Sequence, residues 1–320
     1  MKTKQASLLR YPGGKARFAP FIEQVLQANE QRATVLAEPF CGGAGVSLAL
    51  LEAGAVKRVA LNDADPLVSA LWQCVFSPAD ADWLAEQVIS IPLDIDEWKR
   101  QKALEPASLR ERALKALYLN RTSFNGIIHR AGPVGGWGQT KRTVGARFNR
   151  YKLVKRITEL SKLHKQVEVY NEGWREFMLR MADRKRVCFY LDPPYYYKAE
   201  QLYGHIFTEA QHIELRDYLQ ELKLPWLLSY DDVQEVRALY DTMGVHARVV
   251  DNTYSTHPMG GASFVGREVF YTNLEHMPAV VPAPHIGLTV RHVESEPSAF
   301  ITVVRPPVEV PSGGPSPTPS

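Results

Sequence analysis

Short apolar runs alternate along the chain with longer segments whose apolar residues recur at helical spacing. Residues 18–29 have this spacing and predict a helix. The apolar run 34–40 then predicts a buried strand, glycine-rich residues 41–45 a turn, residues 46–54 a helix, and residues 56–63 a second strand that ends in an acid. This order of strand, glycine loop, helix and strand predicts the start of a doubly wound α/β sheet.

The pattern changes to amphipathic helical segments after the second strand. The expected helices are residues 81–89, 95–104, 110–124 and 150–165, with a Gly-rich loop or hairpin at 131–145. Strand patterns return at residues 166–170, 186–192, 224–230, 246–255 and 267–273. The sequence therefore predicts one α/β domain interrupted by a mostly helical insertion.

These changes of pattern divide the chain into four parts. Residues 1–76 and 166–275 are expected to form the two halves of the α/β domain, and residues 77–165 the helical insertion with its hairpin. Ten of the 22 prolines lie between Pro278 and Pro319. Residues 276–320 are therefore expected to be a disordered Pro-rich tail, with docking through a short apolar run as the alternative.

Composition adds little to this picture. The 320 residues are 45% hydrophobic and 23% charged, as in ordinary globular proteins, and the net charge of +3 does not by itself imply a nucleic-acid partner. Cys41, Cys74 and Cys188 form no CxxC pair, which argues against a metal site or a disulfide framework. Without a signal peptide or an apolar run of about 20 residues, the protein is expected to be soluble and cytoplasmic.

The glycine loop, Gly42, Gly43 and Gly45, lies where a strand turns into a helix. Glycine there allows a ligand to approach the backbone closely, and the acid Asp63 at the end of the next strand can bind ribose hydroxyls. A tight strand–helix turn would give the same pattern. Further evidence is therefore needed to identify a ligand.

Two residues near this loop distinguish between possible cofactors. Leu48 stands where a dinucleotide site requires a small third residue. Glu38, just before the loop, would repel a pyrophosphate but suits a positively charged ligand such as S-adenosylmethionine. The loop therefore favours S-adenosylmethionine over NAD.

The tetrapeptide Asp192-Pro193-Pro194-Tyr195 follows an apolar strand. The two prolines remove backbone donors and hold Asp192 extended, so the turn presents a carboxylate and carbonyl oxygens. Such a turn accepts hydrogen bonds from an amino group, and Tyr195 offers a flat face for a planar base. The alternative is a Pro-rich turn whose tyrosines pack on the core.

Together these motifs resemble the Dam-type family of DNA adenine methyltransferases. The resemblance covers roughly residues 7–273 and follows the order RYPGGK, AEPFCGGAG, LNDADPL, YLNRTSFNG, LDPPY and REVFYTN. It implies a class I methyltransferase fold, a Rossmann-like mixed sheet flanked by helices, with an inserted mostly helical DNA-recognition domain. It also implies S-adenosylmethionine as the cofactor.

The resemblance assigns roles to individual positions. Asp192, Pro193, Pro194 and Tyr195 would hold an adenine flipped out of the duplex while its amino nitrogen attacks the methyl group directly. The implied cofactor-binding residues are Tyr11, Lys15, Glu38, Phe40, Gly42, Gly43, Gly45, Asp63 and Asp192.

DNA contacts are expected from the insertion. Residues 141–165 contain nine Lys or Arg and one acid, Glu159, a pattern that suits phosphate binding as well as a solvated helix face. The resemblance implies that Phe124 wedges into the DNA and that the Gly-rich segment is the recognition hairpin. The implied DNA-binding residues are Arg10, Arg121, Phe124, Asn125, His129, Arg130, Lys141 and Arg142.

One position departs from the family pattern. GATC-methylating relatives have a base-reading arginine where this chain has His129, and Arg130 is its possible substitute. GATC is therefore one possible target site. The alternatives are a methyltransferase for the exocyclic amino group of cytosine and a DNA-binding relative that has lost catalysis.

The expected partner is double-stranded DNA, with no membrane, no metal and a monomeric protein in solution. A bacterial or phage origin and a restriction-modification role would fit the family.

Overall fold

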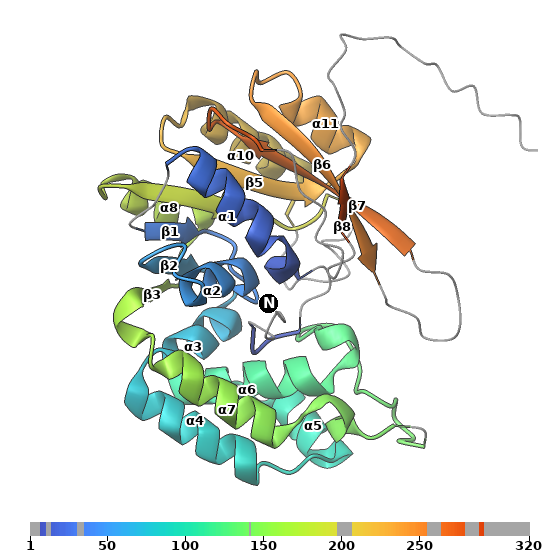
Figure 1. Ribbon diagram of the computed structural model, residues 1–320. Coiled ribbons are helices and arrows are strands. Elements are labelled where there is room, and N and C mark those ends of the chain that lie inside the picture. Colours follow the sequence, from blue (N-terminus) through green and yellow to red (C-terminus); the bar gives the residue numbers. More distant parts are fainter. Residues whose placement is uncertain are drawn as a thin grey trace, which may run out of the picture.

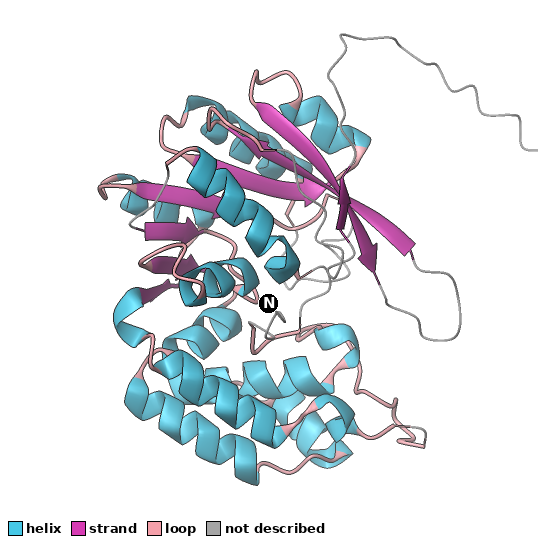
Figure 2. Ribbon diagram, viewed as in Figure 1, coloured by secondary structure: helices cyan, strands magenta, loops and turns pink. Residues whose placement is uncertain are grey.

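The computed structural model describes residues 7–10, 14–30, 35–140, 142–196, 207–254, 264–278 and 288–290. Within these residues, eight strands form one sheet in the order β3-β2-β1-β4-β5-β7-β6-β8 (Figures 1 and 2). The strands are β1 (Val35–Glu38), β2 (Val59–Asn62), β3 (Val167–Tyr170), β4 (Val187–Leu191), β5 (Trp226–Asp231), β6 (His246–Tyr254), β7 (Phe264–Thr272) and β8 (Leu288–Val290).

The first five strands of the sheet run parallel, and β7 reverses the direction. β7 is antiparallel to both β5 and β6, between which it lies. The carboxyl ends of β1, β2 and β4 therefore meet at one edge of the sheet, the place where α/β sheets bind ligands. The mixed α/β sheet expected from the sequence is confirmed.

Alternating side chains of the central strands are buried on opposite faces of the sheet. Leu36, Cys188 and Leu227 belong to one core, whereas their neighbours Phe189 and Leu228 belong to a second. Because both faces are covered, the strands are apolar throughout rather than alternating with polar residues.

Helices from different parts of the chain cover the two faces (Figure 1). The first core includes side chains of η1 (Lys15–Phe18), α1 (Ala19–Ala28) and α2 (Gly45–Glu52). The second includes side chains of α8 (Trp174–Ala182), α10 (Glu209–Glu221) and α11 (Gln234–Tyr240).

The insertion is helical, and polar residues cap its helices. Asp94 accepts hydrogen bonds from the first turn of α5, Ser108 forms a capping box with Glu111 in α6, and Asn149 caps α7. α3 (Pro66–Val75) precedes the insertion. The elements that follow it are α4 (Pro78–Ser90), α5 (Ile95–Ala103), α6 (Leu109–Thr122), η2 (Phe124–Gly126), η3 (Val144–Arg147), α7 (Arg150–Ser161) and η4 (His164–Gln166).

The insertion shares its core with the α/β domain. Trp72 in α3, Leu117 in α6 and Ile157 in α7 belong to the same buried cluster as Leu36 of β1. α3 packs against α6, so the boundary expected after residue 76 separates elements that are packed together.

Part of the segment expected to be a disordered tail is a strand. β8 pairs antiparallel with β6, with Leu288 opposite Asn252 and Val290 opposite Val250. The correction has a physical reason, because the outer edge of β6 offers unpaired backbone donors and acceptors that a short segment can satisfy. The rest of that segment beyond residue 278 lies outside the described residues.

Candidate active site and DNA-binding surface

Asp192 follows β4 directly, at the carboxyl edge of the sheet. Its side chain is 26% exposed, and its Oδ1 accepts hydrogen bonds from Lys15 Nζ at 2.8 Å and Ser229 Oγ at 3.2 Å. Its Oδ2 has no hydrogen-bond partner within the described part of the chain. The carboxylate is therefore fixed by one oxygen and offers the other.

Tyr195 is buried beside Lys15. Its hydroxyl accepts a hydrogen bond from Lys15 Nζ at 3.1 Å and donates one to Glu268 Oε1 at 3.1 Å, and the ammonium lies 4.7 Å from the ring centroid. Pro193 is also buried, and Pro194 is half-buried. The ring expected to stack on a base is thus part of a buried polar cluster.

The members of this cluster come from distant parts of the sequence. Lys15 begins η1, Ser229 lies on β5, and Glu268 lies on β7, with Glu268 Oε2 3.3 Å from Lys15 Nζ. Burial alone lowers the pKa of Lys15, but the carboxylates of Asp192 and Glu268 outweigh it and raise this pKa well above its usual value. Sequence reasoning missed Ser229 and Glu268, although an acid in the otherwise apolar run of β7 is a signal for the latter.

The glycine loop is hydrogen-bonded to the residue that follows β2. The Gly42 N–H donates to Asp63 Oδ2 at 2.8 Å, and the Trp72 indole donates to the Gly42 carbonyl at 2.8 Å. A Cβ at Gly45 would lie 3.1 Å from the Cβ of Ala16, a tight contact, so glycine favours this approach of α2 to η1. Gly43 lies in the same turn.

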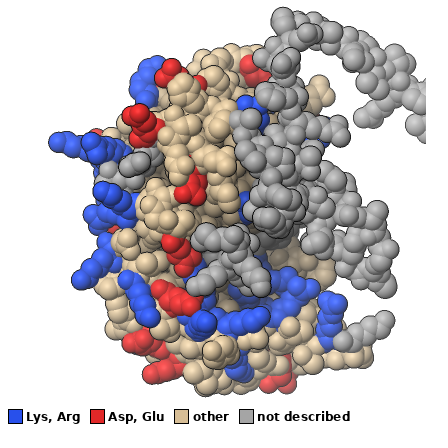
Figure 3. All heavy atoms as spheres, in the orientation of Figure 1, with Lys and Arg blue, Asp and Glu red and all other residues tan. Residues whose placement is uncertain are grey.

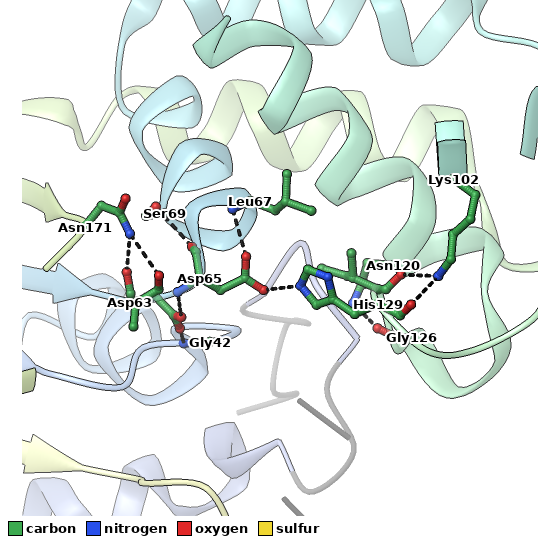
Figure 4. A network of polar contacts seen from close by, with 12 residues as sticks. Gly42, Asp63, Asp65, Leu67, Ser69, Lys102, Asn120, Gly126, His129 and Asn171 are labelled. Atoms are coloured by element: carbon green, nitrogen blue, oxygen red, sulfur yellow. Dashed lines mark hydrogen bonds and ion pairs between the residues drawn. The ribbon is translucent and has the colours of Figure 1, made fainter. Parts of the chain in front are cut away.

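Asp63 is held by backbone donors from both sides (Figure 4). Its Oδ1 accepts the Asp65 N–H at 2.9 Å, and its backbone carbonyl accepts the Asn171 side chain at 2.8 Å. Burial and the nearby charge of Asp65 raise the pKa of Asp63 to about 7.

Glu38 ends β1 and is 3% exposed. Its Oε2 is buried without a hydrogen-bond partner in the described part of the chain. Burial raises the pKa of Glu38 well above its usual value, and the charges of Asp192 and Asp63 act in the same direction. A buried carboxyl in this state can be satisfied by a ligand that donates a hydrogen bond or carries positive charge.

Phe40 lies beside the loop with two aromatic neighbours. Its ring centroid is 6.4 Å from that of Trp174 and 5.7 Å from that of Phe207. Tyr11, the other aromatic residue expected near a cofactor, lies outside the described residues.

Asn120 joins the N-terminal segment to the turn after α6. Its side chain accepts the Arg10 N–H at 2.7 Å and donates to the carbonyls of Arg10 at 3.0 Å and Gly126 at 2.7 Å. Gly126 has φ +79°, and a Cβ there would lie 2.2 Å from the Arg10 carbonyl oxygen. The sequence YLNRTSFNG places this asparagine, but its role was not foreseen.

The same turn presents an aromatic side chain to solvent. Phe124 is 58% exposed and is therefore not a core residue, and Asn125 has a left-handed backbone with φ 55°. The turn therefore projects Phe124 outward.

Three arginines lie close together beside this turn. Arg121 is buried, its guanidinium donates to the Leu8 carbonyl, and its Nε has no hydrogen-bond partner among the described residues. Burial and the nearby charge of Arg10 lower the pKa of Arg121 to about 10, and burial and the charge of Arg147 lower that of Arg10. In the described part of the chain no carboxylate forms an ion pair with any of the three.

His129 points toward Asp65, in the loop that follows β2 (Figure 4). Its Nε2 is 2.6 Å from Asp65 Oδ2, while Asp65 Oδ1 caps α3 through the Leu67 N–H. The imidazole thus links the segment after α6 to the loop that contains Asp63. Arg130 is exposed.

The Gly-rich segment forms a loop rather than two paired strands. In the described residues of this region a single bridge joins Ser123 and Pro133, and the Gln139 side chain binds the Val134 carbonyl and the Val144 N–H. Arg142 is exposed on this loop, and Lys141 lies outside the described residues.

The basic residues at 141–165 are not equivalent. Arg156 is buried and forms an ion pair with Glu52 of α2, and Arg150 donates to the carbonyls of Val88 and Ile91. These two arginines hold α7 in place. Lys and Arg side chains nevertheless gather across the lower part of the face in Figure 3, where the insertion lies in Figure 1.

A comparison with protein families gives one match. A family model described as D12 class N6 adenine-specific DNA methyltransferase matches residues 11–256, well over half of the chain. Glu268 lies beyond the matched residues.

The described residues contain no helix that is long and apolar enough to cross a membrane. They also contain no group of three or more His, Cys, Asp or Glu side chains that could hold a metal ion.

Proposed function

The chain belongs to the D12 class of N6 adenine-specific DNA methyltransferases, and from this premise we propose that it uses S-adenosylmethionine to methylate an adenine turned out of double-stranded DNA. The observation that supports this proposal most directly is the carboxylate of Asp192. One of its oxygens is fixed by hydrogen bonds, and the other is available to a ligand beside buried acids. Because its DNA substrate lies inside the cell, this activity supports the intracellular location expected from the sequence.

The acids at the edge of the sheet fit a positively charged cofactor. When bound, S-adenosylmethionine supplies an electrophilic methyl group attached to a sulfonium. Glu38 Oε2 lacks a partner among the described residues and would accept a hydrogen bond from the methionine ammonium. Asp63 would bind the ribose, and Phe40 would contact the adenine of the cofactor.

The DPPY turn would hold the target amino group. The free oxygen of Asp192 and a carbonyl of the turn would each accept a hydrogen bond from the adenine N6. These bonds favour a pyramidal nitrogen and so make its lone pair available for in-line attack, and they stabilise the positive charge that develops there. Catalysis would thus come from positioning and electrostatics.

The arginines around the turn after α6 would bind phosphate. Arg10, Arg121 and Arg147 lie together without a carboxylate partner in the described chain, and a phosphate would restore the charge balance and satisfy Arg121 Nε. The exposed ring of Phe124 would then enter the stack next to the flipped base.

The target site depends on residues that differ from the family pattern. Reading guanine requires a bidentate donor such as Arg130, because His129 is bound to Asp65. GATC is therefore proposed as one of the sites to be tested.

The function is tested by methylation of duplex DNA and by sequencing that detects modified bases. Wild-type protein should modify adenine, and Asp192→Ala should lose roughly 100-fold or more of the transfer rate while its affinity for DNA persists. Asp183→Ala is the matched control, because Asp183 is exposed after α8. Modification of cytosine alone, no modification, or normal methylation by Asp192→Ala would contradict the proposal.

A further inference from the structure

The ammonium of Lys15 donates two hydrogen bonds and forms an ion pair with a second carboxylate within one buried cluster. Nζ lies 2.8 Å from Asp192 Oδ1, 3.1 Å from the Tyr195 hydroxyl and 3.3 Å from Glu268 Oε2. Lys15 is 4% exposed and Glu268 2% exposed, so water does not compete for these contacts. Any change at Glu268 is therefore transmitted to Asp192 through Lys15.

Glu268 is placed by the sheet rather than by a loop. It lies on β7 opposite Asp231 of β5, two positions from Ser229, which also donates to Asp192 Oδ1. Its Oε1 accepts the Tyr195 hydroxyl proton at 3.1 Å. The adjacent strands β5 and β7 thus both help to position Asp192 Oδ1, β5 directly through Ser229 and β7 indirectly through Glu268.

The charge balance explains why a second acid is useful here. A single Lys–Asp pair is neutral, so the ammonium would partly cancel the negative charge of Asp192. Asp192 needs that charge to accept a hydrogen bond from an amino group that is becoming positive. With Glu268 the cluster contains one cation and two carboxyl groups. The negative charge of Asp192 then remains available to the substrate.

We propose that Glu268 is a positioning residue for methyl transfer, which acts by holding Lys15 and Tyr195 so that Asp192 keeps one oxygen fixed and the other free and negative. This inference rests on the proposed function. It assigns to Glu268 no direct contact with DNA or cofactor.

The test is the single-turnover methylation rate of Glu268→Gln at saturating DNA and S-adenosylmethionine. The rate is expected to fall roughly 10- to 100-fold, as when the support of a reacting group is removed. The affinities for DNA and for the cofactor should stay within about two-fold of wild type. Glu268→Asp restores the charge and should recover part of the rate. A wild-type rate in folded Glu268→Gln would overturn the inference.

The pH profile distinguishes this role from simple structural support. Lys15 faces Asp192, Tyr190 and Tyr195 from the β4 side and Glu268 from β7, and their charges raise its pKa. Removal of one carboxylate should let Lys15 lose its proton at lower pH. The alkaline fall in rate should therefore begin at lower pH in Glu268→Gln, and an unchanged profile would contradict the inference.

A double-mutant cycle with Lys15→Met keeps the test decisive. Because Glu268 acts through Lys15, adding Glu268→Gln to Lys15→Met should reduce the rate little further, whereas fully additive losses would overturn the inference. If Glu268→Gln does not fold, Lys15→Met must itself lower the rate at least 10-fold, and a wild-type rate would again overturn it. Failure of the wild-type protein to methylate adenine would instead reject the proposed function.

Discussion

At the scale of single residues, the proposed ribose contact of Asp63 would make cofactor binding depend on protonation. Its pKa is raised to about 7 by burial and by Asp65, so the ionised form that suits ribose hydroxyls dominates only above neutral pH. Both oxygens accept backbone N–H groups, which keeps the carboxyl in place in either state.

We predict that the affinity for S-adenosylmethionine rises between pH 6 and pH 8, the range of about one unit on each side of the raised pKa. Isothermal titration calorimetry measures this rise, and Asp63→Asn should lack it. The cofactor's own amino group titrates near this range with both proteins, so the difference between them isolates Asp63. Equal pH dependence in the two proteins would contradict the prediction.

The residues at this scale were predictable in unequal degree. Asp192 and Glu38 follow apolar strands and carry a local signal in the sequence. Glu268 has only a weak signal, because its closeness to Lys15 depends on β7 entering the sheet between β5 and β6. Asn120 likewise lies in a quoted motif, but its bonds to Arg10 and Gly126 depend on tertiary packing.

At the scale of elements, the contact between His129 and Asp65 joins the segment after α6 to the start of α3 and the loop that contains Asp63. The two side chains are 36% and 14% exposed, so the pair is partly screened and stabilises the contact only modestly. A base can be read by His129 only after this contact breaks.

Asp65→Asn should therefore strengthen DNA binding about two- to five-fold, because it releases His129 and removes a negative charge near the DNA. The amide oxygen keeps the cap on α3. Fluorescence anisotropy with a short duplex measures the change. Asp96→Asn, on exposed α5, changes the net charge equally and should bind DNA like wild type, so an equal gain in both variants would refute the explanation.

The elements themselves were largely predictable from periodicity. The first seven strands and the helices α1, α2, α4, α5, α6 and α7 lie where apolar spacing predicted them. The helices α3, α8, α10 and α11 were not predicted. Of the loop or hairpin expected at residues 131–145, the described residues form the loop, held by hydrogen bonds of the Gln139 side chain.

At the scale of the whole molecule, one ion pair fastens the insertion to the α/β domain. Arg156 of α7 binds both carboxylate oxygens of Glu52 in α2, at 2.5 and 2.8 Å, and its side chain is 9% exposed. Loss of Arg156 leaves the Glu52 carboxylate, which is 30% exposed, without this partner.

Arg156→Met should lower the free energy of unfolding by roughly 1–3 kcal/mol, discounted for the partial exposure of Glu52. Urea denaturation measures this loss, and DNA affinity should change little. Lys155→Met gives the opposite expectation, since Lys155 is exposed: normal stability and weaker DNA binding at low salt. The reverse pattern would show that Arg156, not Lys155, binds phosphate.

The strand β8 affects how readily copies of this protein can associate through the edges of their sheets. Without it, Val250 to Asn252 of β6 would present open backbone groups at the rim of a long sheet, a template for another chain to add to. Because β8 pairs with these residues of β6, it makes this part of the edge unavailable to another copy. Removal of residues 288–290 should therefore increase self-association, which sedimentation or light scattering would measure.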